Sequence, residues 1–535
     1  MKTMISSIIL ASCLALPLAS CSDSDAAPEQ KDWSTTTYFY SADAAMQDTY
    51  YKPTVGYVGD PMPFFDPVAG DFKVLYLQDF RPNPEGTYHP IWGVSTKDAA
   101  HYTSLGELVS CGTKKSQDAA IGTGSTIYDE SSKLYYTFYT GNKYLPTGDE
   151  SAQAVMVATS SDFKTWTKDR TFLLKGQDFG YDKNDFRDPF VFKGDDGKFH
   201  MLVSTKKGGK GSLAEFVSDD LKNWTDNGVF MTMMWDRFYE CPDLFKMGDY
   251  WYLVYSEIHH AVRRVQYFKG RTLDELKACT ANDAGRWPDA HEGFLDSRGL
   301  YAGKTASDGT NRYLWGWCPT RSGKDNTAVG ASPAEPEWGG NLVCYKLIQH
   351  EDGTLTLGQV DAVSEKYNQD VAVEVKESQN MTEADGTYTL AGKAQQPDAY
   401  MLMGRLGNHN KISFTVTTSN EWDKFGISMV RGSDSKKYYT MVVNPENEND
   451  RKINFEEQGV EGKGFIAGID GYVFARPADN VYNITIYTDN SICVMYINDV
   501  CSYTNRIYGI QKNCWSIDSF NGANVKVSNL KISQY

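Results

Sequence analysis

Five short runs rich in aromatic and β-branched residues recur along the first two thirds of this chain. Each run follows a turn-forming Gly, Asp or Ser, which is the pattern of a β-strand bounded by a turn. The runs are residues 72–78, 133–140, 198–204, 250–256 and 312–317. Intervals of roughly 50 to 65 residues between them are too long for a single hairpin but fit one four-stranded sheet per unit. The sequence therefore predicts a five-bladed β-propeller over residues 37–360.

A short motif returns after several of the predicted strands. Residues 160–166 and 218–224 share the form Ser-x-Asp-(Phe/Leu)-Lys-x-Trp, and residues 95–98 begin in a similar way. A motif that returns once per unit is typical of a structural device shared by repeats. We interpret it as a strand–turn–strand element that packs a Trp, so it marks the blades and carries no chemistry.

The pattern changes near residue 370, where apolar and polar residues begin to alternate. Residues 482–488, 492–497 and 525–532 show a period of two, as half-buried strands do. The size of residues 361–535 suits a β-sandwich, so we predict an all-β fold in which a β-sandwich follows the propeller. Helix signals are scarce, and residues 272–278 are the best short candidate.

The N-terminus carries the features of an export signal. Lys2 supplies a positive end, residues 5–18 supply an apolar run, and residues 18–21 resemble a bacterial lipoprotein cleavage site. This resemblance implies a signal peptide over 1–20, lipidation of Cys21 and an acidic tether over 21–36. The apolar run is too short for a transmembrane helix. We therefore expect an extracytoplasmic protein that a lipid anchors at the cell surface, on the outer membrane.

Composition excludes some classes of partner. The formal net charge is -16 and no basic patch is evident, which argues against nucleic acid as a partner. No spacing of potential ligands exceeds chance as a metal-binding pattern, and there is no C-x-x-C pair. We therefore expect no metal.

The cysteines permit disulfides without requiring them. An even number remains outside the export signal, and most of these residues are expected to be small core residues. Cys493 and Cys501 flank a predicted two-residue turn at Asn498 and Asp499. Alternation along the strands would place the two cysteines on opposite faces, which disfavours a bridge between them.

Three acidic residues stand in motifs that each contain a proline. Asp60 lies in Val-Gly-Asp-Pro-Met-Pro-Phe, Asp188 in Phe-Arg-Asp-Pro and Glu240 in Tyr-Glu-Cys-Pro-Asp-Leu-Phe. Proline disfavours helix for the residue before it, so we predict these carboxylates at strand ends or tight turns. Carboxylates that come from distant parts of a chain and are held on rigid strands suit the cleavage of glycosidic bonds.

These motifs belong to a longer ordered set that resembles glycoside hydrolase family 32, the fructan-processing enzymes. The set comprises residues 60–61, Gln78, residues 122–125, 138–142, 187–189, 240–242, 316–317 and 337–340, and a hairpin over 482–506. Each motif is weak alone, but their order covers nearly the whole chain beyond the export signal. The resemblance implies a five-bladed propeller followed by a C-terminal β-sandwich.

The resemblance also implies a role for each acidic residue. Asp60 would be the nucleophile, Glu240 the general acid and then the base, and Asp188 a ligand of fructose hydroxyls that stabilises the transition state. Arg187 can hold a neighbouring carboxylate through its forked donors. The predicted substrate-binding residues are Gln78, Ser125 and Arg187 from these motifs, together with Trp92 and Trp317, whose rings could stack on sugars although tryptophans are more often core residues. The carboxylates carry both chemical steps, so no cofactor is needed.

The chain departs from the family at its first motif, which commonly reads Trp-Met-Asn-Asp-Pro-Asn-Gly. Gly59 and Met62 replace the two asparagines, which are associated with sugar contacts. A sucrose-specific enzyme is therefore less expected than one that acts on a fructan polymer or oligosaccharide. We expect levan first and inulin second as the substrate, with endo-cleavage favoured.

Two other functions stay open from the sequence. Related five-bladed propellers cleave arabinans or xylans with three carboxylates, usually by inversion, although the Glu-Cys-Pro motif argues against this. The changed asparagines also fit a non-catalytic lipoprotein that binds glycan and presents it to a transporter. The presence of all three carboxylates argues against that second alternative.

Overall fold

A computed structural model gives the fold and its side-chain packing. It describes residues 49–535 apart from 81–87, 234–237, 258–263, 280–291, 322–323, 328–337, 394–398, 433–436 and 460–472. The predicted signal peptide, Cys21 and the tether lie outside the described residues. Within the described ranges, no helix has the length and apolar character needed to cross a membrane.

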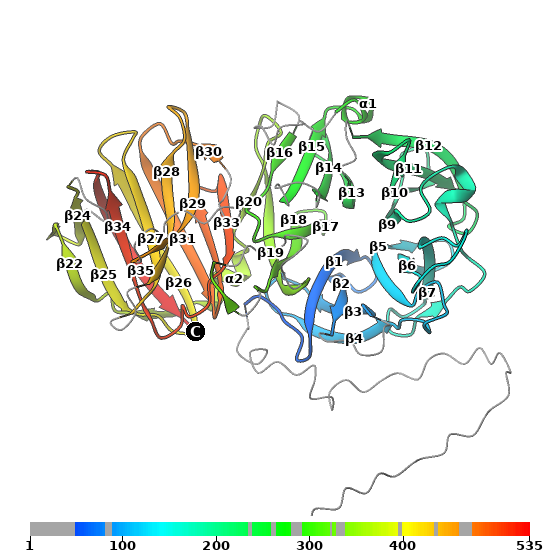
Figure 1. Ribbon diagram of the computed structural model, residues 1–535, viewed down its shortest axis with the longest axis horizontal. Coiled ribbons are helices and arrows are strands. Elements are labelled where there is room, and N and C mark those ends of the chain that lie inside the picture. Colours follow the sequence, from blue (N-terminus) through cyan, green and yellow to red (C-terminus); the bar gives the residue numbers. More distant parts are fainter. Residues whose placement is uncertain are drawn as a thin grey trace, which may run out of the picture. The chain divides into compact units, whose positions relative to one another are not determined.

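The first twenty strands form five antiparallel four-stranded blades of a β-propeller (Figure 1). The first blade contains β1 (Tyr57–Asp66), β2 (Asp71–Asp79), β3 (Ile91–Thr96) and β4 (Thr103–Val109). The second contains β5 (Ala120–Asp129), β6 (Leu134–Asn142), β7 (Gln153–Ser160) and β8 (Thr167–Lys168), and a 3-10 helix (Gly176–Phe179) follows it. The third contains β9 (Phe186–Lys193), β10 (Phe199–Lys207), β11 (Lys210–Ser218) and β12 (Thr225–Thr232).

The last two blades complete the propeller. The fourth contains β13 (Glu240–Met247), β14 (Tyr250–Glu257), β15 (Arg264–Gly270) and β16 (Glu292–Phe294). The fifth contains β17 (Tyr301–Ser307), β18 (Arg312–Pro319), β19 (Gly340–Gln349) and β20 (Leu355–Gly358). β19 also pairs with β1 through Val58 and Gly340, which joins the last blade to the first. The predicted five-bladed propeller is confirmed, and each of the five predicted runs is the second strand of a blade.

The repeated motif forms the same turn after the third strand of the first three blades. Asp162 accepts the backbone N–H groups two and three residues further on, both at 2.8 Å. Asp98 and Asp220 make the equivalent bonds at 2.8 to 3.0 Å, which defines an Asx-type turn. Trp166 and Trp224 lie edge-on against buried rings. The prediction that this motif is structural and marks the blades is confirmed.

The first strands of the blades surround the propeller axis, and each carries a β-bulge. Strands β1, β5, β9, β13 and β17 contact one another in a closed ring (Figure 1). Each loses register with its neighbour by one extra residue, as a β-bulge does. The extra residues lie between Gly59 and Met62, Gly122 and Gly124, Arg187 and Phe190, Glu240 and Asp243, and Tyr301 and Lys304. The bulges therefore form a ring of irregular backbone around the axis.

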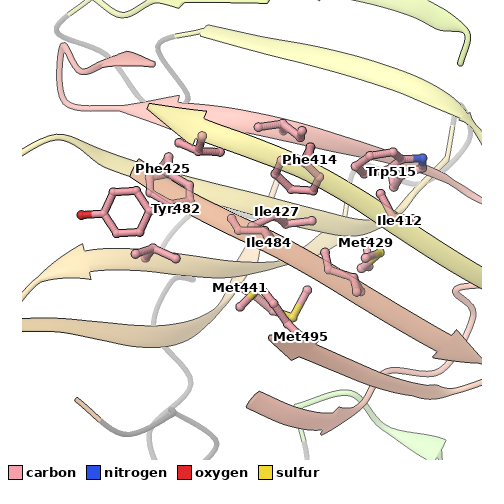
Figure 2. Packing of buried hydrophobic residues seen from close by; sticks show 14 of the residues in the cluster. Ile412, Phe414, Phe425, Ile427, Met429, Met441, Tyr482, Ile484, Met495 and Trp515 are labelled. Carbon is pink, nitrogen blue, oxygen red and sulfur yellow. The ribbon is translucent and has the colours of Figure 1, made fainter. Parts of the chain in front are cut away.

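The remaining strands form two packed sheets, which confirms the predicted β-sandwich. One sheet contains β21 (Gln369–Val371), β23 (Met381–Ala384), β24 (Thr387–Ala391), β26 (His409–Thr418), β31 (Val481–Asp489), β32 (Ile492–Ile497), β33 (Cys501–Arg506) and β35 (Asn524–Gln534). The other contains β22 (Val375–Gln379), β25 (Ala399–Arg405), β27 (Lys424–Arg431), β28 (Tyr438–Pro445), β29 (Asp450–Gln458), β30 (Val473–Ala475) and β34 (Cys514–Phe520). Apolar side chains from both sheets meet in one core, as Figure 2 shows around Phe414, Ile427 and Ile484.

Helices are few among the described residues. The predicted segment 272–278 contains α1 (Leu273–Lys277), and the side chain of Thr272 caps it by accepting the N–H of Glu275 at 3.1 Å. This capping explains why such a short helix forms. A second helix, α2 (Asp361–Lys366), lies between the propeller and sandwich strands and was not predicted.

The prediction that Cys493 and Cys501 lie on opposite faces is wrong. The loop between β32 and β33 has three residues rather than two, because Ile497 pairs directly with Cys501. Both cysteines therefore face the same sandwich core. They are nevertheless free thiols, as are the other cysteines of the described residues.

The sandwich supports the strand ends of the fifth blade. Arg506 on β33 is buried and donates to the carbonyl oxygens of Cys318 at 2.8 Å and Pro319 at 2.7 Å. Asp296, also buried, accepts the backbone N–H of Thr504 at 2.8 Å. Because removing one partner of a buried charged hydrogen bond is costly, the Arg506 contacts fix the end of β18, and the Asp296 contact fixes the segment that follows β16.

Candidate active site

All three predicted carboxylates lie on first strands and at their bulges. Asp60 is on β1, Asp188 on β9, and Glu240 begins β13. Asp60 and Asp188 have positive φ angles of 33° and 57°, and Cys241 beside Glu240 has one of 51°. The prediction of strand ends or tight turns holds only for Glu240, since the two aspartates are inside strands. Such backbone strain at several points of one site is characteristic of functional positions.

The prolines of the three motifs fit this geometry. Pro61, Pro189 and Pro242 each follow a residue with positive φ within a bulge. A bulge leaves one residue outside the ladder of hydrogen bonds, so the missing N–H of proline costs little there. The Asp-Pro and Cys-Pro pairs therefore mark the bulges at which the three carboxylates lie.

Both carboxylate oxygens of Asp60 accept a hydrogen bond from another blade. Thr123 Oγ1 on β5 donates to Oδ2 at 2.8 Å, and Trp317 Nε1 on β18 donates to Oδ1 at 3.0 Å. Trp317 is fully buried. Its indole N–H thus orients Asp60, and its ring has no face exposed for a sugar. Two donors from other blades therefore hold the carboxylate in one orientation.

Glu240 is held by a cation and a hydroxyl. Arg187 Nη2 donates to Glu240 Oε1 at 2.9 Å, and the Tyr301 hydroxyl donates to Oε2. The other arm of the guanidinium donates to Asp185 at 2.8 Å, and the Arg187 Cζ atom lies 3.8 Å from the centre of the Phe238 ring. The prediction that Arg187 holds a neighbouring carboxylate is confirmed, and that carboxylate is Glu240.

Asp188 is the most deeply buried of the three carboxylates. It is 4% exposed, and its Oδ2 accepts the backbone N–H of Cys241 at 2.9 Å. Burial raises the pKa of Asp188 to about 7, and the charges of Glu240 and Asp60 add to this, while Arg187 opposes it. A carboxyl with this pKa changes its protonation state near neutral pH, which is typical of functional sites.

We expect Asp188→Asn to stabilise the protein above neutral pH. The folded state binds the Asp188 proton more tightly than the unfolded state, so wild-type stability falls as pH rises from about 4 to about 7. The neutral amide removes this loss and still offers an oxygen to the Cys241 N–H. The gain in free energy of unfolding, on the order of a few kcal/mol, should develop over that pH range and be complete above it. Thermal unfolding at a series of pH values measures it, and a gain that does not depend on pH would contradict the expectation.

The other predicted substrate-binding residues are placed differently. Gln78 is fully buried opposite Val58, and its Nε2 donates to the Val55 carbonyl oxygen. Ser125 joins two blades, because its Oγ donates to the Pro189 carbonyl oxygen at 2.9 Å and accepts the N–H of Val191 at 2.9 Å. Trp92 lies on β3, away from the first strands, and packs against Phe80 with ring centres 5.7 Å apart. Ser125 and Trp92 thus have structural contacts, and their role toward a substrate stays a prediction.

Several residues of the site were not singled out from the sequence. Thr123 and Tyr301 contact Asp60 and Glu240 directly, and Lys304 is buried with its Nζ donating to the Gly124 carbonyl oxygen at 2.7 Å. Burial lowers the pKa of Lys304, while the nearby acidic groups oppose that shift. Thr123 falls within the motif at 122–125, although no role was assigned to it. Tyr301 and Lys304 have no sequence signal beyond their positions beside the bulge of a first strand.

Both departures from the family motif have a structural counterpart. A Cβ atom on Gly59 would lie only 2.1 Å from the ring of Trp338, so that ring occupies the space an asparagine would need. Met62 is buried, and its Sδ accepts the N–H of Gly124 at 3.1 Å. The Trp338 ring and the Met62 thioether therefore lie where the family motif has two asparagine side chains.

The described part of the chain holds no group of three or more His, Cys, Asp or Glu side chains arranged for a metal ion. What surrounds the carboxylates is instead a set of donors, namely Thr123, Trp317, Arg187 and Tyr301. Carboxyl groups held in place by such donors are suited to proton transfer and nucleophilic attack.

Solved structures share this architecture. Sucrose-6-phosphate hydrolase from Lactobacillus gasseri superposes with a TM-score of 0.67 at 18% identity, covering 91% of this chain and 94% of that chain. Exo-inulinase from Aspergillus awamori has a TM-score of 0.66 at 16% identity, covering 91% and 98%. At these identities the likeness establishes the fold, a five-bladed β-propeller followed by a β-sandwich.

Sequence comparison also finds relatives of this chain. An insoluble isoenzyme of beta-fructofuranosidase from Arabidopsis thaliana is 26% identical over 310 residues, which is 52% of this chain and 50% of the relative. Sucrose-6-phosphate hydrolase from Vibrio alginolyticus is 26% identical over 240 residues, covering 42% and 45%. The chain thus spans about half the length of these relatives. Two family profiles match, the glycosyl hydrolases family 32 N-terminal domain over residues 50–360 and the "GH32, BT1760-like, C-terminal domain" over 353–532. The chain belongs to glycosyl hydrolase family 32.

Proposed function

We propose that the protein hydrolyses β-D-fructofuranosidic bonds of fructans with retention of configuration. The observation that carries the proposal is the set of donors around two carboxylates on first strands. Asp60 is held by Thr123 and Trp317, and Glu240 is held by Arg187 and Tyr301. One carboxylate is therefore oriented to attack, and the other is oriented to exchange a proton.

The first step forms a covalent intermediate. An Asp60 oxygen attacks the anomeric carbon of the fructosyl unit, and the bond from that carbon to the leaving oxygen breaks. Protonated Glu240 gives its proton to the leaving oxygen, so the departing sugar leaves as an alcohol. The glycosidic electron pair stays with that oxygen, and the fructosyl unit is now esterified to Asp60.

The second step restores the enzyme. Glu240, now ionised, takes a proton from water as the water oxygen attacks the anomeric carbon and the ester bond to Asp60 breaks. Two inversions at the same carbon give net retention. Within the described ranges, the hydrogen bond that the Asp188 carboxylate accepts comes from the Cys241 N–H, and the charges of Glu240 and Asp60 help to raise its pKa. We assign Asp188 to the fructose hydroxyls.

Fructan is the substrate that we favour, levan before inulin, with cleavage inside the chain. Relatives are named beta-fructofuranosidase, fructan 6-exohydrolase and exo-inulinase, which supports a fructose-containing substrate. The exchange of the family asparagines at Gly59 and Met62 supports a polymer over sucrose. Family membership argues against the arabinan- or xylan-cleaving alternative.

The product profile on levan, inulin and sucrose tests the proposal. Short fructo-oligosaccharides from levan would support endo-cleavage of that linkage, whereas free fructose alone would indicate an exo-enzyme. No turnover of any of the three would overturn the proposal and favour the glycan-binding lipoprotein. Adding a metal chelator serves as a control, and it should leave the rate of fructan hydrolysis unchanged.

We also propose that the protein is lipid-anchored outside the cytoplasm through Cys21. The support is the sequence of residues 1–21, whose apolar run ends in Leu-Ala-Ser-Cys. A Cys21→Ala variant should lose metabolic labelling by palmitate and leave the membrane fraction. Unchanged labelling in that variant would contradict the proposal.

A further inference from the structure

A buried lysine reaches across the axis of the propeller. Lys304 lies on β17 at its bulge and is 2% exposed. Its Nζ donates to the carbonyl oxygen of Gly124 on β5 at 2.7 Å. These two strands are not neighbours in the ring of first strands, because β1 lies between them on one side and β9 and β13 lie between them on the other. The Lys304 side chain therefore places its ammonium group inside the ring.

The ammonium group ends close to two of the three carboxylates. The residue before its acceptor is Thr123, which donates to Asp60 Oδ2 at 2.8 Å. The Lys304 Nζ also lies 5.3 Å from the centre of the Phe190 ring, and Phe190 comes two residues after Asp188 on β9. The end of the lysine side chain is thus packed between the strand that orients Asp60 and the strand that carries Asp188.

The charge of Lys304 has no direct partner. Within the described ranges, its Nζ donates to one neutral carbonyl oxygen and forms no ion pair. A buried ammonium group without an adjacent anion is costly, so its charge has to be balanced from further away. The titratable and charged groups around it are Asp60 on β1, Asp188 on β9, Cys241 and Asp243 on β13 and, on the far side of Asp243, Arg312 on β18.

We propose that Lys304 is a positioning residue whose ammonium group, held inside the propeller axis, keeps Asp60 and Asp188 ionised. Attraction between opposite charges is mutual, so a cation that these carboxylates stabilise also favours their charged forms. Arg187 is the other cation beside Asp188, but its donors hold Glu240 and a second carboxylate. The inference rests on the proposed hydrolysis, in which Asp60 attacks as an anion, and it adds a residue that acts through its charge.

Two substitutions at Lys304 remove the charge in different ways. Lys304→Gln keeps a polar donor, whereas Lys304→Met has no donor and a similar length. In both variants the acid limb of the pH profile of kcat/KM for fructan should move to higher pH by roughly one unit, because Asp60 then ionises without the nearby cation. Lys304→Arg keeps the charge and should keep the wild-type limb. Lys164→Met, at an exposed turn after β7, is the matched control and should not move it.

Thermal unfolding gives a second readout that needs no activity. Wild-type stability should fall as pH rises from about 4 to about 7, because folded Asp188 holds its proton more tightly than the unfolded chain does. Without the charge of Lys304, Asp188 should keep its proton to a higher pH, so the fall in stability should extend upward by roughly one unit in Lys304→Gln.

The outcomes separate this inference from the proposed function. If wild type cleaves fructan and both profiles of Lys304→Gln match those of wild type, the role of Lys304 is overturned and fructan hydrolysis stands. A shift of the acid limb in Lys304→Met alone would also overturn it, because the hydrogen bond to Gly124 rather than the charge would then matter. A wild type without activity on any fructan overturns the proposed function, and the unfolding profiles then decide whether Lys304 acts on Asp188.

Discussion

Replacing Asp60 with asparagine should lower kcat/KM for fructan by about 10⁴-fold or more, because loss of a nucleophile removes the covalent route entirely. The amide keeps an oxygen for one of the two donors, Thr123 or Trp317, and has nearly the same volume. The fold should therefore persist while turnover disappears. Initial rates on the preferred fructan, with thermal unfolding in parallel, measure both effects.

A control for this substitution lies on the third blade. Asp195 is an exposed aspartate in the turn that follows β9, the strand of Asp188. Asp195→Asn removes the same charge from the protein without reaching the site, and its rate should equal that of wild type. If Asp60→Asn kept more than about a tenth of wild-type activity while folded, Asp60 would not be the nucleophile.

Glu240→Gln should lower kcat for fructan by about 10²- to 10⁴-fold, because it removes proton transfer in both steps. The amide keeps the size of the side chain and can still accept from Arg187 or Tyr301. The loss in the first step should be far smaller for β-D-fructofuranosyl fluoride, since fluoride leaves without a proton. Comparing pre-steady-state rates on fructan and on the fluoride measures this difference.

Two further experiments test the role of Glu240. Azide needs no general base, so adding it should restore turnover of the fluoride in Glu240→Gln and yield the β-fructosyl azide. Glu130→Gln, at an exposed turn after β5, is the matched control and should need no rescue. Equal losses on fructan and on the fluoride would instead assign Glu240 to binding.

Strand patterning explains how far the fold could be predicted. The second strands of the blades, such as β14 (Tyr250–Glu257), pair with a strand on each side, and their sequences are uninterrupted runs of aromatic and β-branched residues. First strands are interrupted by bulges, as at Asp60-Pro61, and look like turns in the sequence. The propeller could therefore be predicted from its second strands, while the placement of two carboxylates inside strands could not.

The same reason limits the prediction of the site. Asp60 and Glu240 could be found because proline marks their bulges. Tyr301 has no such mark, and its hydroxyl reaches Glu240 only after β17 closes the ring beside β1 and β13. Trp338 is distant from Gly59 in the chain, and their contact depends on the closure of the last blade onto the first. No local pattern encodes such a contact.

The cysteine pair shows how one loop residue alters a prediction. A two-residue turn at Asn498 and Asp499 would put Cys493 and Cys501 on opposite faces, whereas the actual loop also includes Val500. One residue reverses the side on which every following side chain lies, because strands alternate with a period of two. Loop length in a hairpin is set by backbone angles, and both turn residues here have positive φ.

The most direct test is to trap the covalent intermediate. Glu240→Gln incubated with β-D-fructofuranosyl fluoride should accumulate a fructosyl ester, because the first step proceeds without acid and the second lacks its base. Mass spectrometry of the digested protein should find the added mass of one fructosyl unit on the peptide that contains Asp60, and none in the Asp60→Asn, Glu240→Gln double variant. A fructosyl unit on another residue, or rapid release of product with inverted configuration and no labelled peptide, would contradict the assignment of Asp60 as the nucleophile.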